Sequence, residues 1–323
     1  MTKRERVLAA LRGEPVDRVP LAFWLHDFVA ENDVKTFVAE SLRLATTFDW
    51  DYLKPQSRAQ CFAEAWGLRY APSGARAVQY TRTHAPCANA ADLRRLRPAD
   101  PAKGALGEQL EALRQIRAAV GDTPIIWTVF SPMMVVPFLL AGGVEQAMAI
   151  AREEPQALDP ALAALAETLT AYAKLAVRSG ADGLFYATNV ARQGLLSPAE
   201  CRRFQRPWDA RVLDAVAEAP FNMLHVCGAV AHLDEFRDYP VHALSWAASE
   251  SNASLSDVRR RTGRAVAGGL PAKPLIATLS PGAIADKARA AVREMNARGL
   301  LLGPECSINP DTPEALLRAA RVA

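Results

Sequence analysis

Three side chains of metal-binding type stand out in this sequence because of their spacing. His225 and Cys227 occupy positions i and i+2 at the end of an apolar run that begins at Phe221, and Cys306 follows much later. If that run is a β-strand, its period of two residues places both side chains on one face. A neutral imidazole and two thiolates are ligands of zinc sites whose fourth position stays open for substrate. The pattern predicts a zinc enzyme. The alternative is three buried side chains without a metal, because free cysteine is often buried.

The elements that must position these residues alternate along the chain. Strand-like apolar runs occupy residues 19–24, 50–54, 125–130, 183–187, 221–226, 243–246, 265–267 and 299–302. Helical patterns occupy residues 34–48, 106–120, 144–151 with 160–179, 197–217, 229–236, 256–262 and 281–297. Apolar strands that alternate with helices predict parallel βαβ units whose sheet is covered on both faces.

This alternation favours an α/β fold in which residues 1–323 form a single (β/α)8 TIM barrel. The 323 residues are enough for such a barrel, which needs roughly 250. An open dinucleotide-binding sheet is disfavoured because no Gly-x-Gly-x-x-Gly motif follows a strand. Residues 66–98 fit neither pattern, and the turn at 70–76 predicts a small hairpin inserted after the second strand.

A barrel makes the metal-binding pattern more specific. In such barrels the active site lies at the carboxyl ends of the strands. His225 and Cys227 end the predicted fifth strand, and Cys306 lies just past the predicted eighth. All three are therefore expected at the same rim of the barrel.

The composition excludes several classes of partner. Lysine and arginine number 38 against 35 acidic residues, and this near-balance gives no case for a nucleic-acid or membrane partner. Residues 124–144 carry no charge, but their prolines and glycines indicate a buried strand, a loop and a helix start rather than a membrane span. Five cysteines without a disulfide-framework spacing, and residues 1–6 without a signal-peptide pattern, predict a reduced, cytoplasmic protein.

Several segments carry a resemblance to a known family. They are RERVLAALRGEPVDRVP at 4–20, FDWDYLKP at 48–55, GADGLFY at 180–186, LSPAECRRF at 196–204 and CSINPDTPE at 306–314. These segments are similar to motifs of the uroporphyrinogen decarboxylase superfamily and, within it, of the corrinoid-linked methyltransferase branch. The resemblance covers nearly the whole chain and implies a (β/α)8 barrel, in agreement with the strand pattern.

The resemblance also extends to the three candidate metal ligands. Members that move methyl groups from methylcobalamin to a thiol have a His-x-Cys…Cys zinc motif, and His225, Cys227 and Cys306 match it residue by residue. Members that decarboxylate porphyrinogens have an arginine-rich loop near the N-terminus that grips propionate groups. The equivalent residues 21–28 contain no arginine, which disfavours the decarboxylase interpretation.

Two departures from the family pattern affect the cofactor. Residues 268–273 lack the Asn and Asp of the family's usual Gly-Asn-x-Asp-Pro, and the chain has no cobalamin-binding Asp-x-His-x-x-Gly segment. A corrinoid, such as methylcobalamin, is therefore expected on a partner protein or as a free cofactor.

Other residues at the predicted strand ends are candidates for contact with the substrate. Asp51, where the family's decarboxylases place an essential aspartate, is predicted to orient the substrate or to act as an acid or base, with a salt bridge to Lys54 or Arg58 as the alternative. Glu305 is a candidate fourth metal ligand, with a solvated glutamate as the alternative. The predicted substrate-binding residues are His26, Lys54, Tyr186, Asn189 and Trp246.

These observations predict a zinc-dependent methyltransferase that moves a methyl group between a corrinoid and a small thiol activated on zinc. The alternative is a decarboxylase or lyase that acts on a small carboxylated or sulfur-bearing substrate, with Asp51 central. A third hypothesis is a non-catalytic barrel that presents zinc or a corrinoid to a partner. The sequence leaves the methyl acceptor open. A homodimer is common in the superfamily, although no exposed apolar stripe argues for one here.

Overall fold

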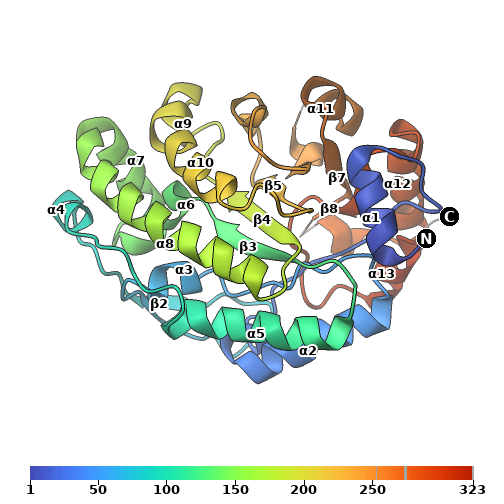
Figure 1. The fold of residues 1–323 in the computed structure, drawn as a ribbon, viewed down its shortest axis with the longest axis horizontal. Helices are drawn as coiled ribbons and strands as arrows, with labels where there is room; N and C mark the ends of the chain where they lie inside the picture. Colours follow the sequence, from blue (N-terminus) through green and yellow to red (C-terminus); the bar gives the residue numbers. More distant parts are fainter. Residues whose placement is uncertain (252, 273–274, 322–323) are drawn as a thin grey trace.

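The strands that carry the metal-binding pattern belong to one parallel sheet. The computed structural model describes residues 1–251, 253–272 and 275–321, and in this part of the chain six parallel strands pair in chain order. They are β3 (Ile126–Phe130), β4 (Gly183–Thr188), β5 (Met223–Val226), β6 (Ala243–Trp246), β7 (Ala265–Leu270) and β8 (Leu300–Pro304). The strands lie inside a ring of helices (Figure 1).

Two extended segments near the N-terminus close this sheet into a barrel. Leu21 pairs with β8 through a bridge to Leu302, and Leu53 pairs with Ile125, the residue before β3. The two segments are joined to each other by a hydrogen bond of 2.9 Å from the Asp51 N–H to the Leu21 carbonyl oxygen. The predicted (β/α)8 fold class is confirmed.

The expected strands at 19–24 and 50–54 are these two segments, and they make isolated bridges rather than regular ladders. Proline accounts for the irregularity, because Pro20 lacks an N–H to donate and Pro55 follows the second segment directly. The carbonyl oxygen of Pro20 still accepts a hydrogen bond of 2.8 Å from the Leu302 N–H. The barrel therefore closes with few backbone bonds on this side.

Helices follow most of the strands and cover the outside of the barrel (Figure 1). The longer ones are α1 (Lys3–Arg12), α2 (Val34–Phe48), α5 (Gly104–Val120), α6 (Pro132–Leu139), α7 (Gly143–Glu153), α8 (Leu158–Arg178), α9 (Pro198–Phe204), α10 (Arg206–Asp214), α11 (Leu255–Thr262), α12 (Pro281–Glu294) and α13 (Glu314–Ala319). The shorter ones are α3 (Cys61–Glu64), α4 (Ala90–Arg94), η1 (Ala30–Asn32), η2 (Pro155–Ala157), η3 (Leu233–Phe236), η4 (Ala248–Glu250) and η5 (Leu275–Thr278).

Most expected helices are present, and the differences have local causes. The expected helix at 197–217 is divided into α9 and α10 at Gln205, because Pro207 cannot sit inside a continuous helix. The expected helix at 229–236 is reduced to η3, since Val230 has a left-handed backbone with a φ of 51°. In α9 the Ser197 side chain accepts from the backbone of Glu200, as the predicted capping signal requires.

The predicted hairpin is present and touches the rim of the barrel. Its strands are β1 (Arg69–Ala71) and β2 (Thr81–His84), which pair antiparallel. Arg76, in the connection between them, donates to the Asp27 carboxylate at 2.7 Å, and its carbonyl oxygen accepts from the Phe28 N–H at 2.9 Å. These contacts fix the loop that follows the first extended segment.

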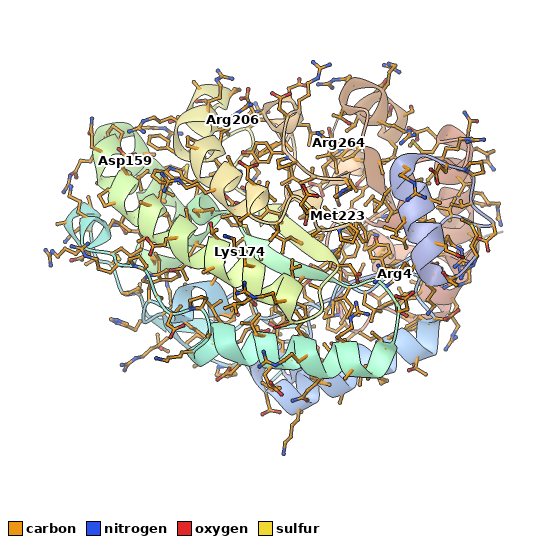
Figure 2. The ribbon with its side chains drawn as sticks, in the orientation of Figure 1. Arg4, Asp159, Lys174, Arg206, Met223 and Arg264 are labelled. Carbon is orange, nitrogen blue, oxygen red and sulfur yellow. The ribbon has the colours of Figure 1, made fainter. Side chains whose placement is uncertain are left out.

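Side chains divide between the barrel centre and the surface. Met223 of β5 lies near the centre of the molecule, whereas Asp159 and Lys174 of α8 and Arg206 of α10 lie on the surrounding helices (Figure 2). Within the described ranges, no helix combines the length and the apolar character that crossing a bilayer requires.

Candidate metal centre

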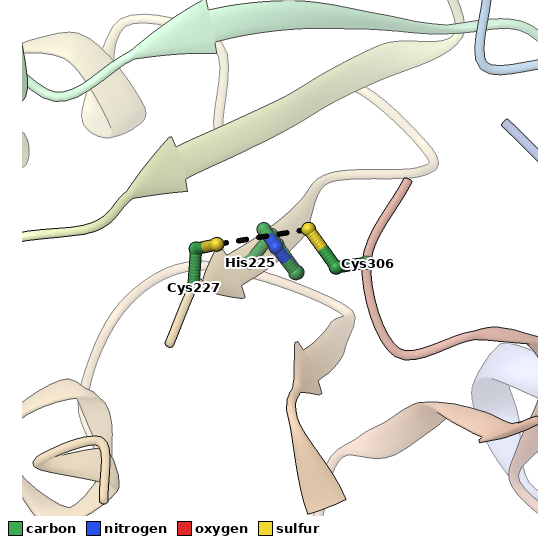
Figure 3. Close-up of side chains that lie close together, drawn as sticks. All are labelled: His225, Cys227 and Cys306. Atoms are coloured by element: carbon green, nitrogen blue, oxygen red, sulfur yellow. Dashed lines mark hydrogen bonds between the residues drawn. The ribbon is translucent and has the colours of Figure 1, made fainter. Parts of the chain in front are cut away.

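The three predicted metal ligands converge at one point of the barrel rim. His225 lies on β5, Cys227 follows its end, and Cys306 lies just after β8. One ligand atom from each lies within 4.8 Å of the others, and the two sulfur atoms are 3.6 Å apart (Figure 3). Two thiolates bound tetrahedrally to one zinc ion, at about 2.3 Å each, are separated by roughly 3.7 Å. The spacing therefore fits a zinc site.

Sheet register places these side chains on the inner face. His225 is paired with Ala187 of β4 on one side and with Ser245 of β6 on the other, so the three residues share one face. The Cys227 N–H donates to the Thr188 carbonyl oxygen at 2.7 Å, which extends the pairing by one residue. The chain then turns away at Gly228, where a φ of 100° favours glycine.

The histidine is oriented for metal binding. Its Nδ1 lies 3.1 Å from the Ser245 hydroxyl oxygen, and the ring is 4% exposed. Its Nε2 is buried and has no hydrogen-bond partner among the described residues. If Nδ1–H donates to Ser245, the Nε2 lone pair is free to bind a cation, which is how metal-binding histidines are usually held. The buried Nε2 therefore fits a metal ligand better than a satisfied core histidine.

The two cysteines differ in acidity. The Cys227 thiol donates a hydrogen bond to the Cys306 sulfur. This hydrogen bond and the nearby His225 ring lower the pKa of Cys306 well below its usual range, although burial acts in the opposite direction. The same hydrogen bond and burial raise the pKa of Cys227. Cys306 is thus the more acidic of the two, and a bound cation would favour the thiolate form of both.

Lys54 and His26 belong to the same region. Lys54 is 4% exposed, and its ammonium nitrogen lies 4.3 Å from the centre of the Phe185 ring. The Phe185 ring stacks on the His225 ring, with centres 5.2 Å apart. Burial lowers the pKa of Lys54 to about 7, against the opposing effects of Cys306 and Glu31. The predicted salt bridge between Lys54 and Asp51 is not formed.

His26 is fixed by two hydrogen bonds rather than free at the surface. Its Nδ1 lies 2.7 Å from a Glu31 carboxylate oxygen, and its Nε2 lies 2.8 Å from the Gln56 amide nitrogen. The Gln56 amide oxygen in turn accepts from the Lys54 ammonium. His26 is therefore connected to the metal region through Gln56 and Lys54.

Asp51 is not brought to the cluster, and its expected place at the end of the second strand is wrong. It lies where the segment enters the barrel, completely buried, next to Leu21. Its carboxylate accepts from Arg6 at 2.8 Å, from Arg18 at 2.9 Å and from the Leu21 N–H at 2.9 Å. Ion pairs therefore account for Asp51, although the partners are not the predicted Lys54 or Arg58.

Tyr186 and Trp246 are also directed away from the cluster. In the register of the sheet Tyr186 pairs with Leu224, and Trp246 pairs with Val226, so both lie on the face opposite to His225. The Tyr186 hydroxyl donates to Asp209 of α10 at 2.5 Å, in the layer between the sheet and the helices. A substrate contact predicted for these two residues does not fit this geometry.

Asn189 and Glu305 complete the predicted set. Asn189 is half-buried one residue past β4, close to the rim, and its carbonyl oxygen accepts from Arg192 at 3.1 Å. Glu305 accepts from the Ser249 N–H at 2.9 Å and from the Ser249 hydroxyl at 2.5 Å. These bonds account for the Glu305 carboxylate without a metal, and it is outside the group of three ligands.

Sequence reasoning missed four residues of this region. Phe185 and Ser245 contact His225, and Glu31 and Gln56 contact His26. The sequence held some indication of Ser245 and Phe185, because each lies in a predicted strand next to the one that contains His225. Glu31 and Gln56 had none, because both come from irregular loops.

Comparison with known proteins places the chain among related barrels. The family model described as uroporphyrinogen decarboxylase (URO-D) matches residues 2–321. A methylcobamide:CoM methyltransferase MtaA from Methanosarcina barkeri is 27% identical over 97% of this chain and 94% of its own length. A uroporphyrinogen decarboxylase from Nocardia farcinica is 26% identical over 73% of this chain and 68% of its own. A methyltransferase structure from Methanosarcina mazei, 24% identical, has a TM-score of 0.81 and covers 99% of this chain and 97% of that one.

Proposed function

Because the chain belongs to the uroporphyrinogen decarboxylase family, we propose that it is a zinc-dependent methyltransferase, which moves a methyl group between a corrinoid and a small thiol. The observation that carries the proposal is the convergence of His225, Cys227 and Cys306, whose ligand atoms lie within 4.8 Å of one another. The methyltransferase name of the Methanosarcina barkeri relative, which aligns over nearly the whole chain, supports it.

The donor set suits the activation of a thiol. A free thiol has a pKa of about 8.5, so only a small fraction is the nucleophilic thiolate at neutral pH. A zinc ion held by one imidazole and two thiolates would lower that pKa in its open fourth position and would fix the thiol in place. A corrinoid would supply the methyl group without its bonding electron pair, and the activated thiolate sulfur would accept it with its own pair.

Residues of this chain orient the His225 ring and pack apolar side chains against it. Ser245 holds the His225 ring through Nδ1. The Phe185 ring covers His225 on one side, and Trp24 packs edge-on against Phe185 with ring centres 5.4 Å apart. Both aromatic side chains are buried, so they give the cluster an apolar wall next to His225.

The corrinoid has to come from outside the chain, as a free cofactor or on a partner protein, because the sequence has no cobalamin-binding motif. The cluster lies at the carboxyl ends of the strands, which is the open end of such barrels. The cytoplasmic location and the homodimer stay predictions. The alternative decarboxylase or lyase, with Asp51 central, gains no support from a carboxylate that is buried against Arg6 and Arg18.

A methyl-transfer assay tests the proposal. Zinc-loaded protein is incubated with methylcobalamin and a panel of neutral and acidic thiols under reducing conditions, and the methylated thiol is identified by mass spectrometry. We expect turnover that falls by about 100-fold or more in His225→Ala. Cys201→Ser, which alters a buried cysteine of α9 outside the cluster, is the matched control and should keep turnover. Turnover in zinc-free protein equal to that of loaded protein would refute the proposal.

A further inference from the structure

Asp209 of α10 is a buried carboxylate whose hydrogen-bond donors within the described ranges are all neutral. Tyr186 donates to one carboxylate oxygen at 2.5 Å, and Tyr239 and Gln205 each donate to the other at 2.9 Å. A fully buried charge without a counter-ion is costly, and these hydrogen bonds offset part of that cost. The three donors come from β4, from the break between α9 and α10, and from the connection after β5. The carboxylate therefore joins three separate elements.

The hydrogen bonds continue from Asp209 toward the metal centre in a fixed direction. A carboxylate only accepts, so the Gln205 amide nitrogen faces Asp209 and the Gln205 amide oxygen faces Thr188. The Thr188 hydroxyl therefore donates to that oxygen, at 3.3 Å. Gln205 and Thr188 are both completely buried, so bulk water does not compete for these groups.

Thr188 connects this chain of hydrogen bonds to a metal ligand. It is the last residue of β4, and its side chain lies on the face of the sheet opposite to His225. Its carbonyl oxygen accepts from the Cys227 N–H at 2.7 Å, one residue beyond the last ladder pair of Thr188 with Val226. A shift of Thr188 would therefore move the Cys227 backbone and, with it, the sulfur.

The connection that follows Cys227 is tied to the same carboxylate. It turns at Gly228, passes through η3 and reaches Tyr239, whose hydroxyl donates to Asp209. Cys227 is thus anchored through its own N–H and through the far end of the connection that follows it. His225, by contrast, is oriented through Ser245 on the inner face of the sheet.

We propose that Asp209 is a positioning residue for the metal centre, which acts through Gln205 and Thr188 to fix the place of Cys227. This inference rests on the proposed function, because it assumes a metal ion bound by Cys227. A sulfur that is already in place leaves little ordering to oppose metal binding. When the chain of hydrogen bonds is broken, the thiol keeps its chemistry but loses its fixed place, and metal affinity falls, as it does when other outer partners of metal ligands are removed.

The test measures metal binding rather than turnover. Zinc dissociation constants are obtained by competition with a chromophoric chelator at pH 7.5, where Asp209 is ionised because burial raises its pKa only to about 6. Thr188→Val keeps the side-chain shape without the hydroxyl and should raise the zinc Kd about ten-fold. Thr188→Ser keeps a hydroxyl and should retain most of the affinity. In Co²⁺-loaded Thr188→Val the sulfur-to-cobalt charge-transfer absorption should weaken, because one thiolate bonds less well.

A double variant tests whether Asp209 acts through Thr188. Asp209→Asn should also raise the zinc Kd about ten-fold, and its combination with Thr188→Val should raise it little further, because both changes break one chain. Thr168→Val is the matched control, since it removes a buried hydroxyl of α8 that bonds to the Ala99 backbone. It should lower stability by a comparable amount and leave the zinc Kd unchanged.

The possible failures are distinguishable. Unmodified protein that binds neither Zn²⁺ nor Co²⁺ would overturn the proposed function and this inference with it. Unmodified protein that binds both ions, with equal zinc affinity in Thr188→Val and Thr168→Val, would overturn the role of the chain alone. Effects that add in full in the double variant would show that Asp209 does not act through Thr188. If Asp209→Asn does not fold, Gln205→Met takes its place, because it breaks the same chain at the next residue.

Discussion

The sulfur atoms of Cys227 and Cys306 lie 3.6 Å apart, although the two residues are separated by 79 positions in the chain. Parallel strands explain this proximity, because β5 and β8 present their carboxyl ends at the same rim of the barrel. Two thiols at this distance repel once both are ionised, so a cation between them is the arrangement that stabilises both thiolates. The predictions below follow from this pair and from its surroundings.

The first prediction concerns oxidation. In zinc-free protein treated with the thiol oxidant diamide, we expect a disulfide between Cys227 and Cys306, because a small approach of the two sulfur atoms suffices. Burial raises the pKa of Cys87 to about 11 and that of Cys201 to about 12, so these thiols should stay reduced. Peptide mapping by mass spectrometry identifies the linked pair. Bound zinc should prevent the reaction, and equal oxidation with and without zinc would contradict the account.

The second prediction concerns the histidine. Ser245→Ala removes the hydrogen-bond partner of His225 Nδ1 and should lower zinc affinity by about 10–100-fold, since outer partners orient metal-binding imidazoles. Competition with a chromophoric chelator measures this change. Ser41→Ala, which alters a hydroxyl on α2 bonded to the Phe37 carbonyl, is the control and should leave the affinity unchanged. Equal affinities in the two variants would show that Ser245 does not orient the ring.

The third prediction concerns Asp51. Asp51→Ala leaves Arg6 and Arg18 without their buried partner and should lower the free energy of unfolding by about 3–5 kcal/mol. Denaturant titration measures the loss. The folded variant should still bind zinc and transfer methyl groups at a near-normal rate. Asp122→Ala, which removes an exposed partner of Arg4, should cost about 1 kcal/mol or less. A folded, zinc-loaded Asp51→Ala protein without activity would restore the catalytic role for Asp51.

The fourth prediction concerns pH. Burial raises the pKa of Asp209 from 3.8 to about 6, against hydrogen bonds from Tyr186, Gln205 and Tyr239. Between these two values the folded protein binds more protons than the unfolded chain, so this residue's contribution to stability falls as the pH rises. The free energy of unfolding of the unmodified protein, relative to Asp209→Asn, should fall by about 2 kcal/mol from pH 3.8 to pH 6. Denaturant titrations across this range measure it, and a constant difference would be the contrary result.

Sequence reasoning found the metal ligands because their positions follow from simple rules. The i, i+2 spacing of His225 and Cys227 fixes a common face, and barrel topology fixes a common rim with Cys306. It failed for Tyr186 and Trp246 because both faces of a parallel sheet are buried. Their strands are buried at every position, so exposure does not alternate between the inner face and the outer.

The position of Asp51 and the environment of Lys54 depend on contacts that sequence patterns do not record. Arg6 and Arg18 approach Asp51 from α1 and from the loop after it. Asp51 is the second residue of the expected strand at 50–54, so it lies where that segment begins and not where it ends. The support of Lys54 comes from Gln56 and from loop residues near Glu31. Such irregular segments have no periodicity from which their contacts could be predicted.

The most direct test of the central claim is the metal content of untagged protein, measured by plasma mass spectrometry beside the Cys227→Ser and Cys306→Ser variants. The account predicts one zinc ion per chain in the unmodified protein and its loss in both variants, with Cys201→Ser unaffected. An unmodified protein that takes up no zinc under reducing conditions, or variants that retain it, would contradict the assignment of His225, Cys227 and Cys306 as a zinc site.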